Sequence, residues 1–75
     1  MAGTMHPHKR RAVVRFLKSL GFLYARRNGP HDVFQHPDGR LTYVPRGSTI
    51  RAGTSRDIAK EINMPPQLFD KLVGR

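Results

Sequence analysis

The chain has 75 residues, 37% of them hydrophobic and 8% aromatic, so it forms one small domain whose core is too limited to enclose a deep substrate pocket. Fourteen Lys and Arg against five Asp and Glu give a formal net charge of +9 at pH 7, which predicts an anionic partner. The absence of Cys excludes a disulfide-stapled miniprotein and a thiolate zinc site. No apolar run is long enough to span a membrane, and the first residues lack the apolar stretch of a signal peptide, so we expect a cytoplasmic protein.

The positive charge is concentrated in the first third of the chain, and every acidic residue lies at or beyond Asp32. The basic residues before that point are Lys9, Arg10, Arg11, Arg15, Lys18, Arg26 and Arg27. A gradient of this kind predicts an electrostatic face that binds nucleic acid, and a solvated, solubilising surface is the alternative.

Residues 9–20 have the apolar spacing of a helix, and Gly21 stands where a left-handed cap commonly ends one. The apolar residues of this stripe are Val13, Phe16, Leu17 and Leu20. The opposite face carries a basic row of Arg11, Arg15 and Lys18. This row suits phosphates, although a plain solvated face is also consistent with it. Residues 1–8 are expected to form a flexible basic arm, and residues 9–75 the folded domain.

Three strand-like runs follow the first helix. They comprise residues 22–27, 32–36 and 41–44, with turn sequences at Asn28-Gly29-Pro30 and Pro37-Asp38-Gly39. Connections this short do not allow the crossovers of a parallel sheet, so the runs predict a three-stranded antiparallel meander.

Two helical segments complete the chain after a polar loop over residues 46–53. Thr54 is expected to be the N-cap of the first, which buries Ile58 and Ile62. Pro66 can open a short terminal helix that buries Leu68, Phe69 and Leu72. The predicted fold is therefore α+β, in the order α-β-β-β-α with a short C-terminal helix.

The four histidines are the side chains suited to proton exchange near neutral pH. His6 and His8 lie in the expected arm, where a positioned general base is not anticipated. His36 precedes a turn and is expected to be structural. His31 follows Gly29-Pro30 on the strand parity opposite to Phe34, and we expect it to be exposed beside Arg26 and Arg27. His31 and His36 point to opposite strand faces with no third ligand evident, so no metal site is predicted, and no cofactor is implied.

Together these segments resemble the HicA family of small bacterial toxins over residues 10–72. The likeness rests on Gly-Pro-His-Asp-Val-Phe-Gln-His-Pro at residues 29–37, Tyr-Val-Pro at 43–45 and Gly-Thr-Ser-Arg-Asp-Ile-Ala-Lys at 53–60. The order and spacing of these segments are specific, whereas no single one of them is.

The resemblance implies a fold similar to double-stranded-RNA-binding domains and a ribonuclease that cuts messenger RNA and arrests translation. It also implies a HicB-type antitoxin partner, and it makes the catalytic histidine of the family His31 in this chain. The sequence departs from the family pattern at two positions: Pro30 replaces the usual Ser, and Asp32 replaces a second His. Asp32 is expected to pair with a protonated His31 if it lies close enough.

The leading hypothesis is therefore a metal-independent mRNA-cleaving toxin in which His31 is the general base. Its predicted RNA-binding residues are Arg26, Arg27, Arg40, Lys60, Arg11, Arg15 and Lys18. A non-catalytic RNA-binding module, and an inactive relative that only binds its antitoxin, are the alternatives.

Overall fold

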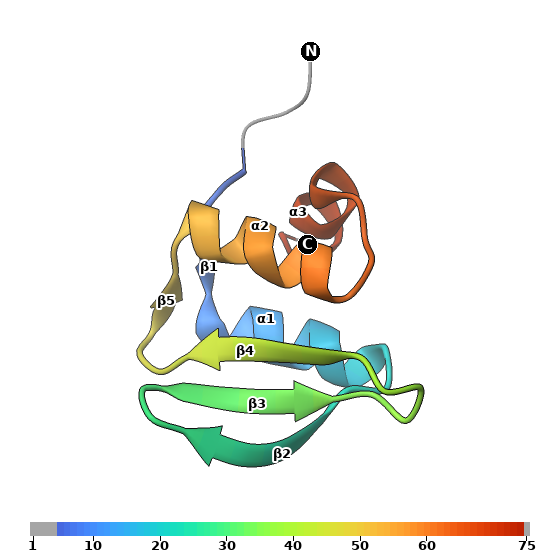
Figure 1. Cartoon of the computed structure of the whole chain (residues 1–75). Coiled ribbons are helices and arrows are strands. Elements are labelled where there is room, and N and C mark those ends of the chain that lie inside the picture. Colours follow the sequence, from blue (N-terminus) through green and yellow to red (C-terminus); the bar gives the residue numbers. More distant parts are fainter. Residues whose placement is uncertain (1–4, 75) are drawn as a thin grey trace.

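The computed structural model describes residues 5–74. In chain order its elements are β1 (His8–Lys9), α1 (Arg10–Ser19), β2 (Leu23–Asn28), β3 (His31–Gln35), β4 (Leu41–Pro45), β5 (Thr49–Ile50), α2 (Ala52–Glu61) and α3 (Pro66–Val73). Strands β2, β3 and β4 form an antiparallel sheet in that order, and the three helices gather on one side of it (Figure 1). The predicted α+β class, the three-stranded antiparallel sheet and the short terminal helix are confirmed.

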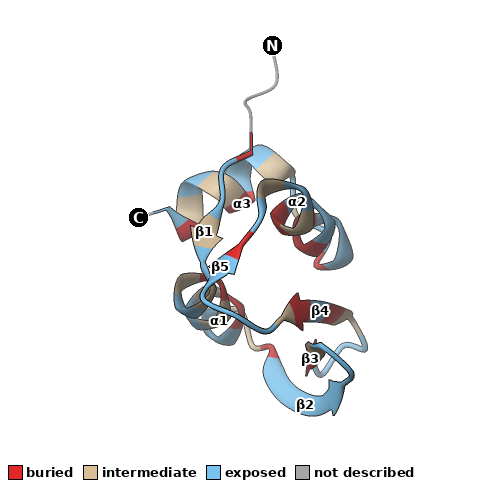
Figure 2. Cartoon of the chain, turned by 90° about the vertical axis from the view of Figure 1, so that its left-hand side faces the viewer, coloured by how far each residue is buried: buried red, intermediate tan, exposed pale blue. Residues whose placement is uncertain are grey.

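The register of the sheet separates two faces, because directly opposed residues of antiparallel strands point the same way. On the inner face Asp32 lies opposite Val44 and Phe34 lies opposite Thr42, and all four side chains are buried. We use the name outer sheet face for the other side, formed by Leu23, Arg26, Asn28, His31, Val33, Gln35, Leu41, Tyr43 and Pro45. Among the described residues no helix covers the outer sheet face (Figure 2).

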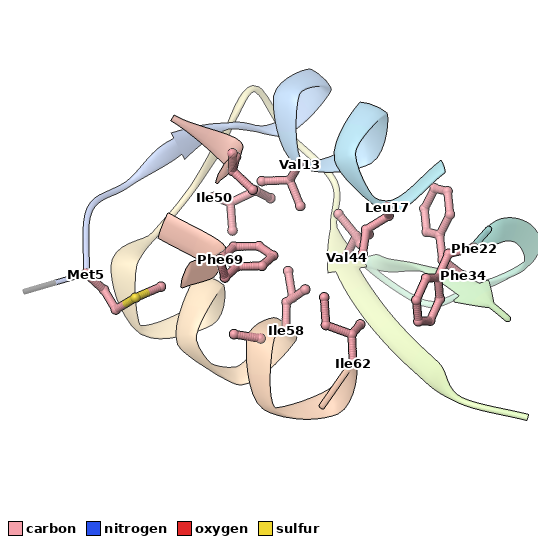
Figure 3. Close-up of a cluster of buried hydrophobic side chains, with 12 residues drawn as sticks. Met5, Val13, Leu17, Phe22, Phe34, Val44, Ile50, Ile58, Ile62 and Phe69 are labelled. Atoms are coloured by element: carbon pink, nitrogen blue, oxygen red, sulfur yellow. The ribbon is translucent and has the colours of Figure 1, made fainter. Parts of the chain in front are cut away.

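The apolar core lies between the inner face of the sheet and the helices (Figure 3). Leu17 of α1, Ile58 of α2 and Phe69 of α3 are fully buried in it. Phe34 contributes from β3, as the sequence pattern predicts. Of the residues expected to be buried in the terminal helix, Leu68 is exposed and Leu72 is only half-buried, whereas Val73 is buried instead.

The end of α1 needs a glycine. Gly21 has φ +99°, the left-handed region expected of a helix cap, and a Cβ at this position would lie 3.0 Å from the His36 ring. The ring of His36 is engaged at both nitrogens: Nε2 lies 3.1 Å from the Leu20 carbonyl oxygen, and Nδ1 accepts the Asp38 backbone N–H at 3.1 Å. The structural role expected of His36 is therefore confirmed.

The segment before α1 differs from the expected loose arm. His8 and Lys9 of β1 pair with Ile50 and Thr49 of β5, and the Met5 side chain is buried in the core. Residues 5–8 thus pack on the domain, and residues 1–4 of the predicted arm lie outside the described part of the chain.

Helix α2 begins earlier than the sequence suggests. It starts at Ala52 with Arg51 at the N-cap position, so Thr54 lies inside the first turn and is not the cap. Ile50 of β5 is fully buried and pairs with His8 of β1. The chain therefore reaches the core at residue 50, and the helix begins two residues later. Within residues 5–74 no helix is long and apolar enough to cross a membrane.

Candidate functional site

His31 is the first residue of β3, directly after the tight turn that Gly29 (φ +60°) allows. It lies opposite Asn28 of β2 and Pro45 of β4, on the outer sheet face, and its side chain is half-buried. Among residues 5–74 the His31 ring takes part in none of the hydrogen bonds that the structure contains. Its nitrogens are therefore available to a bound molecule.

Asp32, the next residue, points to the inner face and forms the centre of an ionic cluster. Its Oδ2 accepts from Arg10 Nη2 at 2.5 Å and its Oδ1 accepts from Arg46 Nη1 at 2.8 Å. Because both carboxylate oxygens are occupied by guanidinium groups and the side chain faces away from His31, the expected Asp32–His31 ion pair is not formed.

The same cluster holds the loop after β4 against the turn before β3. Arg10 Nε donates to the Pro45 carbonyl oxygen at 2.9 Å, and the Arg46 backbone N–H donates to the Pro30 carbonyl oxygen at 3.0 Å. The Arg46 side chain remains 49% exposed, so it presents a cation to solvent one residue beyond the cross-strand partner of His31.

Arg26 and Arg27 lie on different faces of β2. Arg26 is opposite Val33, on the outer sheet face and diagonal to His31, and it is exposed. Arg27 is opposite Asp32, and its Nε donates to the Gly29 carbonyl oxygen at 3.1 Å, which braces the turn before His31. Of the two, Arg26 shares a face with His31.

Two of the predicted RNA-binding residues, Arg40 and Lys60, do not lie beside His31. Arg40 precedes β4 and so lies at the end of the sheet opposite to His31, about 15 Å away along the strands. Its Nη1 donates to the Ile62 carbonyl oxygen at 2.6 Å, and its guanidinium stacks 5.2 Å from the Phe22 ring centroid. Lys60 is exposed in the last turn of α2, next to this contact.

Arg40 also anchors its own turn. Its backbone N–H and its Nε donate to Asp38 at 3.0 and 2.8 Å, and these bonds hold the pKa of Asp38 below its usual value. Arg40 therefore joins the β3–β4 turn to the end of α2 through internal contacts.

The basic row of α1 is exposed as predicted, but its members face different surroundings. Arg11 lines a surface hollow of about 490 Å³ together with Lys9, Arg10 and residues 47–49, beside the Asp32 cluster. Arg15 lines a hollow between α1 and α3 instead. Lys18 lies in the last turn of α1. Only Arg11 thus belongs to the same end of the molecule as His31, and phosphate binding by Arg15 and Lys18 remains a prediction.

A second group of titratable side chains joins the N-terminal segment to α3. His6 Nδ1 lies 2.7 Å from Asp70 Oδ2, and His8 Nε2 lies 2.8 Å from Asp70 Oδ1. Burial disfavours the charged carboxylate, but hydrogen bonds from His6 and His8 outweigh it and lower the pKa of Asp70. Residues 5–74 contain no group of three or more His, Asp or Glu side chains arranged to hold a metal ion.

The arrangement around His31 combines a proton acceptor with cations on a solvent-accessible surface. An imidazole can take a proton from a hydroxyl, and neighbouring guanidinium groups can stabilise charge that develops on a phosphate. Sequence reasoning missed Arg10 and Arg46, although the turn at Pro37-Asp38-Gly39 already implies that the residue after Pro45 comes close to the start of β3.

Comparison with known proteins assigns the sequence to a family. The family model described as HicA toxin of bacterial toxin-antitoxin matches residues 10–64, which span α1 through α2 and include His31, Asp32 and Arg46. No curated protein sequence matches the chain. The matched segment covers most of the molecule, and it contains the sheet and the two helices that flank it in sequence. The chain therefore belongs to the HicA family, the toxins of bacterial toxin–antitoxin systems.

Proposed function

We propose that this toxin is a metal-independent endoribonuclease that cleaves messenger RNA and thereby arrests translation, with His31 as the general base. The observation that carries the proposal is the His31 ring on the outer sheet face, unengaged among the described residues, in a chain of the HicA family. His6, His8 and His36 all bond to other parts of the chain, which leaves His31 as the histidine suited to a substrate.

In the proposed reaction His31 takes the proton of a ribose 2′-hydroxyl, and the resulting oxygen attacks the adjacent phosphorus. The bond from phosphorus to the 5′-oxygen breaks, which leaves a 2′,3′-cyclic phosphate on one product and a 5′-hydroxyl on the other. Arg26, which shares the outer sheet face with His31, is the cation best placed to stabilise the added negative charge on the phosphate. The chemistry requires the 2′-hydroxyl, so DNA of the same sequence should remain intact.

The test is incubation of the purified protein and of His31→Ala with a messenger RNA in EDTA, followed by mapping of product ends. We expect the parent to cleave the RNA and to leave cyclic phosphate ends. His31→Ala should produce no cleavage, because the general base is lost. His6→Ala is the matched control, since this histidine bonds to Asp70 and should retain activity. Intact RNA with the parent, together with salt-sensitive binding, would instead indicate an RNA-binding module without catalysis.

We also propose that the antitoxin is a HicB-type protein and that toxin and antitoxin meet in the cytoplasm. The family assignment supports an antitoxin partner, and the net charge of +9 favours an acidic one. Co-expression with the protein encoded by the neighbouring reading frame tests this: we expect a stable complex and relief of growth arrest. Recovery of the toxin alone, with growth still arrested, would contradict it.

A further inference from the structure

The outer sheet face carries an aromatic ring close to His31. Tyr43 of β4 lies opposite Val33, two residues from Pro45, and it is therefore a diagonal neighbour of His31. Diagonal neighbours on one face are about 7–8 Å apart between their Cα atoms, which is within reach of long and aromatic side chains. Tyr43, His31 and Arg26 thus project from three adjacent strands to the same side.

The Tyr43 ring is partly exposed on the outer sheet face, beside its fully buried cross-strand neighbour Val33. Tyr43 is 36% exposed, and the ring–ring contacts within residues 5–74 do not include it. Tyr24 provides the contrast: although 55% exposed, it points to the other face and packs edge-on against Phe34 with centroids 6.1 Å apart. Of the two tyrosines, only Tyr43 makes no ring–ring contact within the described part of the chain.

The charge around Tyr43 selects the kind of ligand. Arg26 lies opposite Val33 on the same face and is exposed, and the chain carries a net charge of +9. At the free edge of β4, Glu61 Oε1 accepts the Tyr43 backbone N–H at 3.2 Å, and the Arg46 side chain binds Asp32 on the inner side. A partly exposed aromatic ring with a cation on the same face is an arrangement that binds single-stranded nucleic acid, because the base stacks on the ring while the cation holds the backbone.

We propose that Tyr43 stacks on the nucleobase next to the cleaved phosphodiester, and that the RNA bound on the outer sheet face is single-stranded there. This inference rests on the proposed ribonuclease function and makes Tyr43 a substrate-positioning residue. A base stacked on Tyr43 is splayed out of any duplex, so the scissile linkage must lie in an unpaired stretch. Stacking is tolerant of base identity, so Tyr43 selects strand state and not sequence.

Binding variants provide the first test, measured with a short 2′-O-methyl oligoribonucleotide that lacks the attacking hydroxyl. Tyr43→Ala should weaken binding about tenfold or more, because the stacked ring is lost. Tyr43→Phe should bind like the parent, since it keeps the ring face. Tyr24→Ala is the matched control and should also bind like the parent. Equal binding by Tyr43→Ala and the parent would overturn the proposal.

Ring-current shifts in NMR spectra provide a direct readout. The chain has two tyrosines, so in Tyr24→Phe the Tyr43 ring gives the sole tyrosine signals. We expect these signals to move upfield when the oligonucleotide is added, and not when the same oligonucleotide carries abasic sites. Bound RNA without this shift would overturn stacking, as would a shift caused by the antitoxin and not by RNA, which would assign the surface to protein binding.

The two proposals fail in distinguishable ways. A base-dependent shift of Tyr43 with intact RNA in the EDTA assay would retain the stacking platform and remove the catalytic function. Cleavage that depends on His31, with no shift of the Tyr43 signals, would retain the catalytic function and remove the stacking platform.

Discussion

Asp32 shows how a single buried carboxylate organises the end of this toxin that carries His31. Its side chain is only 9% exposed. It binds the guanidinium groups of Arg10 and Arg46, which are 36 residues apart in the sequence. The consequence is that Arg46 is held beside the turn that carries His31.

Asp32→Asn should destabilise the protein by about 2–4 kcal/mol, because two partly buried guanidinium groups lose their charged partner. The measurement is urea-induced unfolding at neutral pH. Asp57→Asn, an exposed carboxylate on α2, is the matched control and should change stability by less than about 0.5 kcal/mol. Equal stability of Asp32→Asn and the parent would mean that the cluster does not hold this end of the domain together.

At the scale of elements, β1 and α3 are joined by the contacts of His6 and His8 with Asp70. These contacts connect the segment before α1 to the last helix, at opposite ends of the sequence. The Phe69 ring lies edge-on to His8 with centroids 6.4 Å apart, and Met5 is buried in the same core. The N-terminal strand is thereby part of the domain and completes the two-stranded sheet with β5.

The stability contribution of Asp70 should depend on pH. The pKa of Asp70 is lowered from its ordinary 3.8, so the folded state favours the carboxylate more strongly than the unfolded state does. Its contribution is therefore full above the unfolded pKa and is lost as the pH falls through the lower folded pKa. We expect Asp70→Asn to be about 1 kcal/mol less stable than the parent at about pH 5, and equally stable once the carboxylate is protonated in both states.

Urea-induced unfolding of the parent and of Asp70→Asn, at about pH 5 and again in acid below the folded pKa of Asp70, measures this difference in stability. Asp57→Asn is the control at both pH values. Amide hydrogen exchange at residues 6–9 should also become faster in Asp70→Asn, because the segment loses its tie to α3. A difference that persists undiminished in acid would show that the carboxylate charge is not what holds β1.

Across the whole molecule, the positive charge is spread over several surfaces, but the residues of the proposed site lie on one. Arg26 shares the outer sheet face with His31 and Tyr43, whereas Arg15 lies beside α3. Arg40 is taken up by contacts with Ile62, Asp38 and Phe22. We therefore expect the RNA to follow the outer sheet face and the adjoining end of the domain.

The salt dependence of RNA binding distinguishes these surfaces. Each phosphate contact on a single strand contributes about 0.7 to the slope of log K against log salt. Arg26→Gln should make the slope shallower by about that amount, and Arg15→Gln should leave it unchanged. Fluorescence anisotropy with a labelled 2′-O-methyl oligonucleotide over a salt series measures both slopes. A shallower slope in Arg15→Gln, with no change in Arg26→Gln, would show that the RNA binds the α1 surface instead.

Much of the fold follows from local patterns. The helical spacing of Val13 and Leu17, the turn sequence around Asp38, and Pro66 at the start of the last helix each specify one element, because such signals act within a few residues. The basic composition and the choice of His31 likewise depend on the sequence alone. The short strands β1 and β5 have no such signal, since two-residue strands lack a detectable periodicity.

The tertiary structure decided which side chains act together. It paired Asp32 with Arg10 and Arg46 instead of His31, and it removed Arg40 from the site by turning it to the end of α2. The turn between β3 and β4 sets Tyr43 diagonal to His31, but only the position of the helices on the other side of the sheet leaves that diagonal uncovered within the described residues. The physical reason is that periodicity reports on neighbours along the chain, whereas ion pairs and exposed faces depend on contacts between segments far apart in sequence.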